Sequence, residues 1–418
     1  MSTRPFIPPR KRPKPPDIPG GKIAIDASIV APLLPQRSVW GIVFPIALIV
    51  GVVGLIGTLY FSGQRSLAGG FGFFGAFAAI GLIGMLVRGR GGQQRKSASE
   101  HYHELRKWFR DLDKKRDDVD AQRRKQWEHQ AFFHWSPDQL IGAVGSEHMW
   151  GRMPGQDDPR KPGAGFGEVR LGLGTSALEM DIDWPKIADP EEQEPASGHA
   201  LKNFILTQPE IKDIPKAIFL PKFPGLSFIG DLDEVRGVAR AMICQLAAHH
   251  RPDHLQIIVV SEHGNDPVWE WVKWLPHVQH PTQRDGCGAV RMVFDSPAAL
   301  ENFLDESDEP RRGQWTKPPV DGPGRGGYQP SPMPFQVIID DACGTPEEWS
   351  GLTGSNGYAS RCFIRLAAAV PDQPPASLLD GAASEWWIGF APDTTFFLSD
   401  GELRRVDQSG AAAMRGMR

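Results

Sequence analysis

The 418-residue chain lacks the cysteine patterns that mark disulfide-stapled and zinc-binding proteins. Its four cysteines are far apart. They form no C-x-x-C pair, the spacing that is typical of a zinc ribbon, and they show no regular spacing that would indicate a disulfide framework. They are Cys244, Cys287, Cys343 and Cys362. We therefore expect buried structural thiols in a reducing cytoplasm.

A strong excess of charge of one sign is also missing. The formal net charge is −4 and the sequence pI is about 6.3. This balance gives no general attraction to nucleic acid, and we expect no concentrated basic face on the cytoplasmic part. We expect no nucleic-acid partner.

Two long apolar runs are present, and they are separated by only a few residues. Val39–Phe61 and Leu67–Val87 contain no Asp, Glu, Lys, Arg or His. Each exceeds the roughly 20 residues that cross a hydrocarbon core of about 30 Å, so the sequence predicts two transmembrane helices in a hairpin. Basic residues flank the hairpin on both sides, which predicts a two-pass inner (plasma) membrane protein with both termini in the cytoplasm and contacts with membrane lipid.

The remaining segments differ in composition, and we expect six parts in chain order. These are a proline-rich basic cytoplasmic arm (1–38), transmembrane helix 1 (39–61), transmembrane helix 2 (67–87), a stalk helix with a small β-containing stalk unit (88–200), an α/β domain (201–400) and a linker (401–418). The arm has the composition of an extended polyproline II segment.

The stalk helix is expected over about Ser97–Gln130, where charged residues surround one narrow apolar stripe. The stripe has three-and-four spacing and consists of Tyr102, Leu105, Phe109 and Leu112. Such a narrow stripe is insufficient to stabilise an isolated helix in water. We therefore predict that it is an assembly surface, covered by a partner chain or by the following domain.

From Leu201 onward, short apolar runs alternate with helical patterns, including a helix from about Asp233 to His250. Continuous β-branched runs separated by helices are typical of a mainly parallel sheet covered on both faces. The expected strands are LSFIG, LQIIVVS, GAVRMVF, FQVIIDD and RCFIRLAAA.

This order of elements resembles a P-loop motor, but its phosphate-binding residues are missing. Where G-x-x-x-x-G-K-[ST] is expected, the chain has GLSFIGDLDE from Gly225 to Glu234, with neither the lysine for the phosphates nor the hydroxyl for Mg²⁺. The acidic residues Asp340 and Asp341 lie at the end of a later predicted strand. They are either a metal-binding Walker B pair or residues that form a turn. The sequence predicts a degenerate nucleotide pocket formed by Gly230, Asp231, Asp340 and Asp341, without catalytic residues, cofactor or ATP hydrolysis.

A possible metal cluster of His249, His250 and His254 lies at a helix end and a strand entry. A proline between them favours exposed capping histidines over metal ligands, so we expect no metal site.

Several short motifs occur in the order found in the N-terminal region of EccC, the FtsK/SpoIIIE-like ATPase family of ESX (type VII) secretion systems. They are IAIDA (23–27), HWSPDQL (134–140), MWGR (149–152), VRLGLG (169–174), AHHRPDHLQIIVV (248–260) and VWEWVKWLPH (268–277), together with the apolar hairpin and the charged stalk. The resemblance covers nearly all of the chain.

The resemblance implies a membrane-anchoring and coupling part of a motor that exports small WXG-type proteins. It implies EccB, EccD and EccE type membrane components and other EccC copies as partners. ATP and Mg²⁺ are expected in three further ATPase domains that would follow Arg418. The alternatives are the membrane subunit of an FtsK-type DNA translocase and a membrane scaffold without a motor.

Overall fold

The computed structural model describes residues 12–18, 20–31, 50, 98–156, 158–186, 189, 191–308, 310–316, 331–344, 346–353, 357–368 and 394–405. Within these residues the chain divides into two compact units. The first comprises residues 1–22, 118–181 and 208–418, and the second comprises residues 23–117 and 182–207.

The expected fold class of a two-span membrane protein is wrong, and with it the two-pass inner-membrane localisation. Among the described residues, no helix combines the length and the apolar character needed to cross a bilayer. The longest described helix, α3 (Ala98–Phe133), has 36 residues but carries charged side chains along its whole length. Both predicted spans, 39–61 and 67–87, lie outside the described residues apart from Val50.

The first unit contains a seven-stranded sheet in the order β13-β12-β5-β11-β10-β6-β9. All neighbouring strands in it are parallel except β12 and β13. The strands are β5 (Gly225–Gly230), β6 (Leu255–Val260), β9 (Val293–Phe294), β10 (Phe335–Asp341), β11 (Arg361–Ala368), β12 (Thr395–Ser399) and β13 (Glu402–Arg405). The continuous apolar runs predicted this parallel sheet, because both faces of its central strands are buried.

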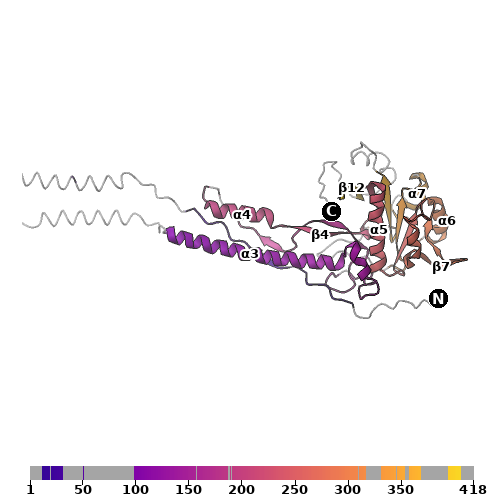
Figure 1. Cartoon of the computed structure of the whole chain (residues 1–418), viewed down its shortest axis with the longest axis horizontal. Coiled ribbons are helices and arrows are strands. Elements are labelled where there is room, and N and C mark those ends of the chain that lie inside the picture. The colour runs from indigo at the N-terminus through magenta and orange to yellow at the C-terminus, as the bar shows by residue number, and fades with distance from the viewer. Residues whose placement is uncertain are drawn as a thin grey trace, which may run out of the picture. The chain divides into compact units, whose positions relative to one another are not determined.

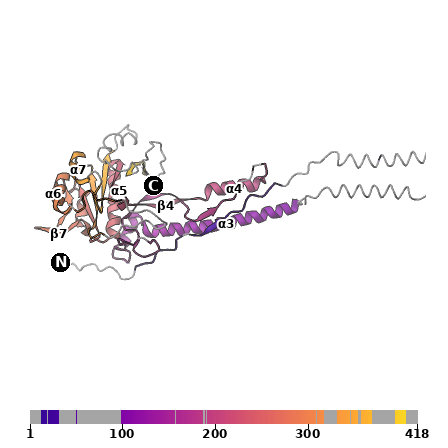
Figure 2. The same ribbon diagram turned by 180° about the vertical axis from the view of Figure 1, so that it is seen from behind.

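Figures 1 and 2 show α5 (Leu232–His249) on one side of this sheet, and α6 (Pro297–Asp308) and α7 (Pro346–Thr353) on the other. Apolar side chains of α5 such as Ile243 and Leu246 join those of the strands in one core. Short 3₁₀ turns η2 to η5 connect the elements: Pro137–Gly142, Leu220–Lys222, Glu270–Trp274 and Pro276–Val278.

The run GAVRMVF does not form one strand as predicted. It divides into β8 (Gly288–Arg291), which pairs with β7 (Gln279–Asp285), and β9, of which only two residues join the sheet. A second antiparallel ribbon joins β2 (Glu168–Ala177) to β4 (Glu210–Phe219). The short strands β1 (Lys22–Ala24) and β3 (Asp181–Asp183) also pair.

The second unit contains α4 (Pro195–Thr207) and the first half of α3. The Trp108 indole donates a hydrogen bond to the Ala27 carbonyl at 2.8 Å, and the Ile29 amide donates to the Ser197 hydroxyl at 3.1 Å. Backbone and indole donors therefore fix the segment 25–31 in this unit.

The predicted stripe on α3 differs from the side that the structure buries. Tyr102 is 64% exposed, Leu105 and Phe109 are half-buried, and Leu112 is buried. Trp108, which the stripe omitted, is also buried. In the part of α3 that belongs to the first unit, the buried residues are Val119 and then polar residues such as Gln126. The Gln126 amide donates a hydrogen bond to the Ala177 carbonyl at 3.1 Å. An apolar periodicity cannot reveal a buried side that is partly polar.

Candidate functional site

The connection between β5 and α5 is too short to hold a phosphate. The strand ends at Gly230, Asp231 is the N-cap, and the helix begins at Leu232. The Asp231 carboxylate accepts hydrogen bonds from the amides of Asp233 and Glu234 at 3.1 and 3.2 Å. The free amides that a P-loop turns toward a phosphate are thus partly used by a side chain of the chain itself.

The glycine before this cap is also enclosed. A Cβ atom added to Gly230 would lie 2.6 Å from the backbone oxygen of Leu398 in β12. Gly225 and Gly230, which the sequence suggested as the two glycines of a phosphate loop, are the ends of β5 itself. No loop of any length separates the strand from the cap.

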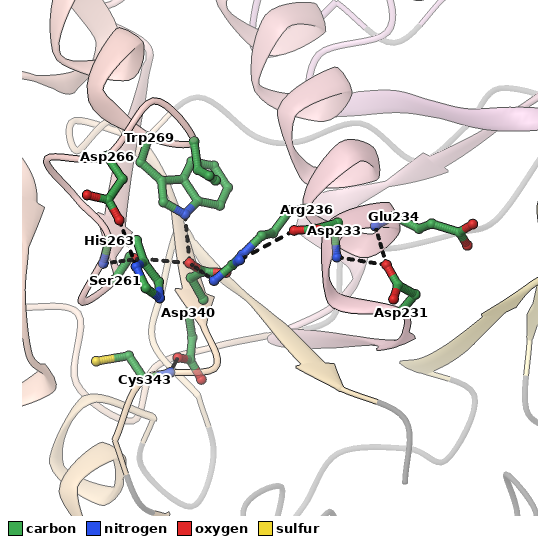
Figure 3. Close-up of polar contacts among 12 residues, drawn as sticks. Asp231, Asp233, Glu234, Arg236, Ser261, His263, Asp266, Trp269, Asp340 and Cys343 are labelled. Carbon is green, nitrogen blue, oxygen red and sulfur yellow. Dashed lines mark hydrogen bonds and ion pairs between the residues drawn. The ribbon is translucent and has the colours of Figure 1, made fainter. Parts of the chain in front are cut away.

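Asp341, at the end of β10, is bound by a ring of donors rather than being open toward a metal ion. The Arg236 guanidinium of α5 donates to both carboxylate oxygens, at 2.7 and 3.0 Å. The hydroxyl of Ser261 and the indole of Trp269 also donate to this carboxylate, at 2.6 and 2.7 Å. Figure 3 shows that the side chains of Arg236, Ser261 and Trp269 come from different elements and point toward one another.

This arrangement neutralises the carboxylate that a Walker B strand would offer to Mg²⁺. The side chain of Asp341 is fully buried, and that of Arg236 is 10% exposed. The hydrogen bond to Asp341 raises the pKa of Arg236, so the guanidinium remains charged. A bidentate arginine-carboxylate pair in a buried setting is a strong interaction that a metal ion would have to displace.

Asp340, its neighbour, has a different environment. The Cys343 amide donates to one oxygen at 2.8 Å, and the Arg365 guanidinium lies 3.9 Å from the other. Burial raises the pKa of Asp340 to about 7, despite the opposing effects of these two groups. The two adjacent acids therefore differ: Asp341 is paired, and Asp340 is partly protonated near neutral pH.

The structure thus brings the predicted residues to one edge of the sheet but gives them separate partners. Asp231 caps α5, Asp341 binds Arg236, and Asp340 binds the backbone after its own strand. Sequence reasoning missed Arg236, Ser261 and Trp269. The position of Arg236, one helical turn after the cap and on the side facing the sheet, was the available signal for Arg236.

The family motifs also meet at a second place, which we call the motif junction. It lies around the C-terminal end of α5 and involves the motifs HWSPDQL, MWGR, VRLGLG, AHHRPDH and WLPH. The Arg170 guanidinium donates to the His134 carbonyl at 3.2 Å, and the amide of Arg152 donates to the His249 carbonyl at 3.0 Å. His277 bonds through Nε2 to the carbonyl of His250 at 2.8 Å.

Arg152 is the central side chain of the motif junction. It is 6% exposed, and its guanidinium donates to the carbonyls of Glu168 and Phe133. The end of α3, the start of β2 and the MWGR segment are therefore held by one buried cation. Five motifs far apart in the sequence form one packed polar cluster.

Of the three histidines expected to be exposed, His249 and His250 are buried and His254 is half-buried. His250 is fully buried; its Nε2 accepts a hydrogen bond from the Gly167 amide at 2.8 Å. Burial lowers the pKa of His249 to about 3, that of His277 to about 4, and that of His250 well below the usual value. In the described part of the chain, no group of three or more His, Cys, Asp or Glu side chains has the arrangement of a metal site.

The cysteines form no disulfide among the described residues. Cys343 and Cys362 are buried as expected, whereas Cys244 and Cys287 are exposed.

No profile of a known protein family matches the chain. Curated relatives do match it. The ESX-5 secretion system protein EccC5 of Mycobacterium tuberculosis is 31% identical over 361 residues, which cover 85% of this chain and 25% of the relative. The ESX secretion system protein EccC of Thermomonospora curvata is 28% identical over 372 residues, covering 88% of this chain and 26% of the relative.

The ESX-1 secretion system protein EccCa1 of Mycobacterium tuberculosis is 34% identical over 185 residues, which cover 41% of this chain and 24% of that protein. Among solved structures, the cytoplasmic domain of the Thermomonospora curvata type VII secretion ATPase EccC aligns with 49% of this chain at 10% identity and a TM-score of 0.31. The chain spans about a quarter of the length of the curated relatives. Its similarity to them extends over most of its own length, and the chain is an EccC-like protein, related to the EccC proteins of ESX secretion systems.

Proposed function

We propose that this chain is a coupling module of an ESX type VII secretion motor and that it does not hydrolyse ATP itself. The observation that carries the proposal is the buried pair of Arg236 and Asp341. Asp341 stands where a motor ATPase would hold Mg²⁺, and here an internal cation occupies both of its oxygens.

Two further features support the absence of hydrolysis. A single residue, Asp231, joins β5 to α5, so there is no loop to surround a triphosphate. The carboxylates of Asp231, Asp233 and Glu234 are exposed at the helix start and would repel one. These three carboxylates also stabilise α5, because acidic groups at a helix N-terminus complement the helix dipole.

A coupling role needs rigid connections between elements, and the motif junction supplies them. The end of α3, the ribbon of β2 and β4, and the end of α5 are linked there by Arg152 and Arg170. We propose that EccB, EccD and EccE type components and other copies of the chain act on this framework. Export of WXG-type proteins, with ATP and Mg²⁺, would then be the task of further ATPase domains of the motor.

The proposal predicts negligible nucleotide binding by the chain. Calorimetric titration of the whole protein with Mg-ATP should give no saturable binding in the micromolar range. The Arg236→Ala variant, in which Asp341 loses its internal cation, is the matched comparison and should hydrolyse no ATP either, since the phosphate loop is still missing. Micromolar affinity for Mg-ATP in the unchanged protein would disprove the proposal.

The exposed end of the α3 stripe remains available to a partner. We propose that Tyr102, with the half-buried Leu105 and Phe109, contacts another chain of the secretion complex. Leu112 is already buried within the second unit, so it is not part of this surface.

Replacement of Leu105 and Phe109 by Ala tests this surface in the assembled complex. Truncating well-packed Leu and Phe side chains costs roughly 2–5 kcal/mol each, so co-purification with partner components should fall sharply. Lys107→Ala, an exposed position on the same helix, is the control and should co-purify normally. Wild-type yield of complex from the double variant would show that the stripe is not an assembly surface.

A further inference from the structure

A small pocket of about 40 Å³ lies within the motif junction. Its lining includes three charged side chains, Arg12 of the N-terminal arm, Arg152 and the exposed Glu147, together with His148 and His249. A single water needs roughly 10–15 Å³ measured in this way, so the pocket has room for a small polyatomic ion. No step in the proposed function uses it.

Two arginines against one exposed glutamate give the pocket lining a net positive charge. The half-buried Arg12 donates to the Gly151 carbonyl at 2.6 Å. No ion pair joins it to a carboxylate among the residues that the structure describes, and the charge that acts on it is that of Arg251. Burial and this like charge both lower the pKa of Arg12. A half-buried guanidinium without a counter-ion is unfavourable, and an anion in the pocket would stabilise it.

The other side offers a buried acceptor without a partner. His249 is 5% exposed, and its Nε2 atom has no hydrogen-bond partner. The His249 ring makes a hydrogen bond to the backbone of His148. Because Nε2 has no partner, we assign this bond to Nδ1. An Nδ1–H that donates to a carbonyl leaves a lone pair on Nε2, because the buried ring is neutral. This atom accepts a hydrogen bond and repels a fully deprotonated anion.

These two sides together select the chemistry of a ligand. It must present anionic oxygens toward Arg12 and an O–H group toward His249. Hydrogen phosphate and a singly protonated phosphomonoester have both, whereas sulfate and chloride have no proton to donate at neutral pH. We propose that this pocket binds a protonated phosphate group.

The phosphate group would fasten the N-terminal arm to the motif junction. The arm already makes two polar contacts there: Arg12 donates to the Gly151 carbonyl at 2.6 Å, and the Pro16 carbonyl lies 3.1 Å from the His129 ring. A ligand that bridges Arg12 and His249 adds a third contact, to the end of α5. Occupancy of the pocket therefore controls how firmly the arm is held.

Calorimetric titration of the whole protein with sodium phosphate, and in parallel with sodium sulfate at equal ionic strength, tests the proposal. We expect saturable phosphate binding at least about tenfold tighter than sulfate binding, since a charge-assisted hydrogen bond accounts for that ratio. Arg12→Gln should weaken phosphate binding by about tenfold or more. Lys14→Gln, an exposed charge on the same arm, is the control for net charge and should change it little.

Two replacements of His249 test the acceptor. Asn reproduces the position of Nδ1 and keeps the bond to His148 but lacks Nε2, so His249→Asn should weaken phosphate binding as much as Arg12→Gln. Gln places an amide oxygen near the position of Nε2, so His249→Gln should restore part of the affinity. Equal affinities in both variants and the unchanged protein would overturn the proposal, as would equal binding of sulfate and phosphate.

A third titration, with a phosphoserine peptide, distinguishes the source of the group. Binding of both phosphate and the peptide supports a phosphomonoester ligand, and binding of phosphate alone supports the free ion. Binding of neither in the millimolar range overturns the proposal and leaves water as the occupant. Asp341 and Arg236 are unchanged in every variant, so these results are independent of the Mg-ATP experiment.

Discussion

Replacing Asp341 with Asn should lower the free energy of unfolding by about 3–5 kcal/mol, which is the typical cost of removing one partner from a buried ion pair. The side chain keeps its shape but loses its charge, and Arg236 loses its buried counter-charge. Denaturation in urea should show a lower midpoint with an unchanged slope. The effect is large because the Arg236 side chain is only 10% exposed and water solvates little of its charge.

The matched control uses the other carboxylate near Arg236. Asp233 lies 3.6 Å from this guanidinium, but its side chain is 89% exposed. Solvent screens such a pair, so Asp233→Asn should cost at most about 1 kcal/mol. Combining Arg236→Met with Asp341→Asn should recover much of the lost stability, because no unpaired charge remains. If Asp341→Asn cost no more than Asp233→Asn, the buried pair would not be structural.

The second large effect is a loss of stability in mild acid. His249, His250 and His277 have pKa values lowered by burial, to about 3 for His249 and about 4 for His277. Their stabilising contribution is therefore complete above the unfolded pKa near 6.5 and is lost as the pH falls toward the folded values. Asp340 acts in the opposite direction, because its pKa is raised to about 7 and it releases a proton on unfolding.

Between about pH 6 and pH 4.5, unfolding should therefore take up at least about two protons, three by these histidines less one from Asp340. Burial also lowers the pKa values of His148, His254 and His280, which adds to the uptake. The free energy of unfolding should fall by about 3 kcal/mol for each pH unit in this window. Urea denaturation at several pH values measures the slope. Asp340→Asn removes the opposing proton and should steepen the slope by about 1 kcal/mol per pH unit. A flat profile over this range would contradict the burial of neutral histidines at the motif junction.

Most of the α/β architecture could be predicted from the sequence. The strands β5, β6, β10 and β11 coincide with continuous apolar runs, because a strand covered on both faces has no polar side to interrupt it. The prediction failed for β8 and β9, where a single apolar run serves two sheets. It also failed for α3, since Gln126 and His129 are buried through specific polar contacts that hydrophobic spacing does not report.

For the candidate nucleotide site, the sequence predicted only which phosphate-binding residues are missing. The missing lysine and hydroxyl after Gly230 are visible in the sequence, as are the acids that follow. The partner of Asp341 was not visible, because Arg236 lies 105 residues away and only the register of the folded sheet brings the two together. The same holds for the motif junction, in which His134, Arg152 and His249 belong to three separate segments.

The sequence by itself therefore determined the local features of this protein: where apolar runs form strands, that a helix starts at about Asp233, and that no phosphate loop follows β5. These depend on residues within a few positions of one another, whose preferences act before any tertiary contact exists. Tertiary structure alone decided that Arg236 neutralises Asp341, that the histidines are buried and neutral, and that Arg12 and His249 line one pocket. Each of those outcomes depends on distant groups being desolvated together, and burial sets both the strength of the charges and the pKa values of the side chains.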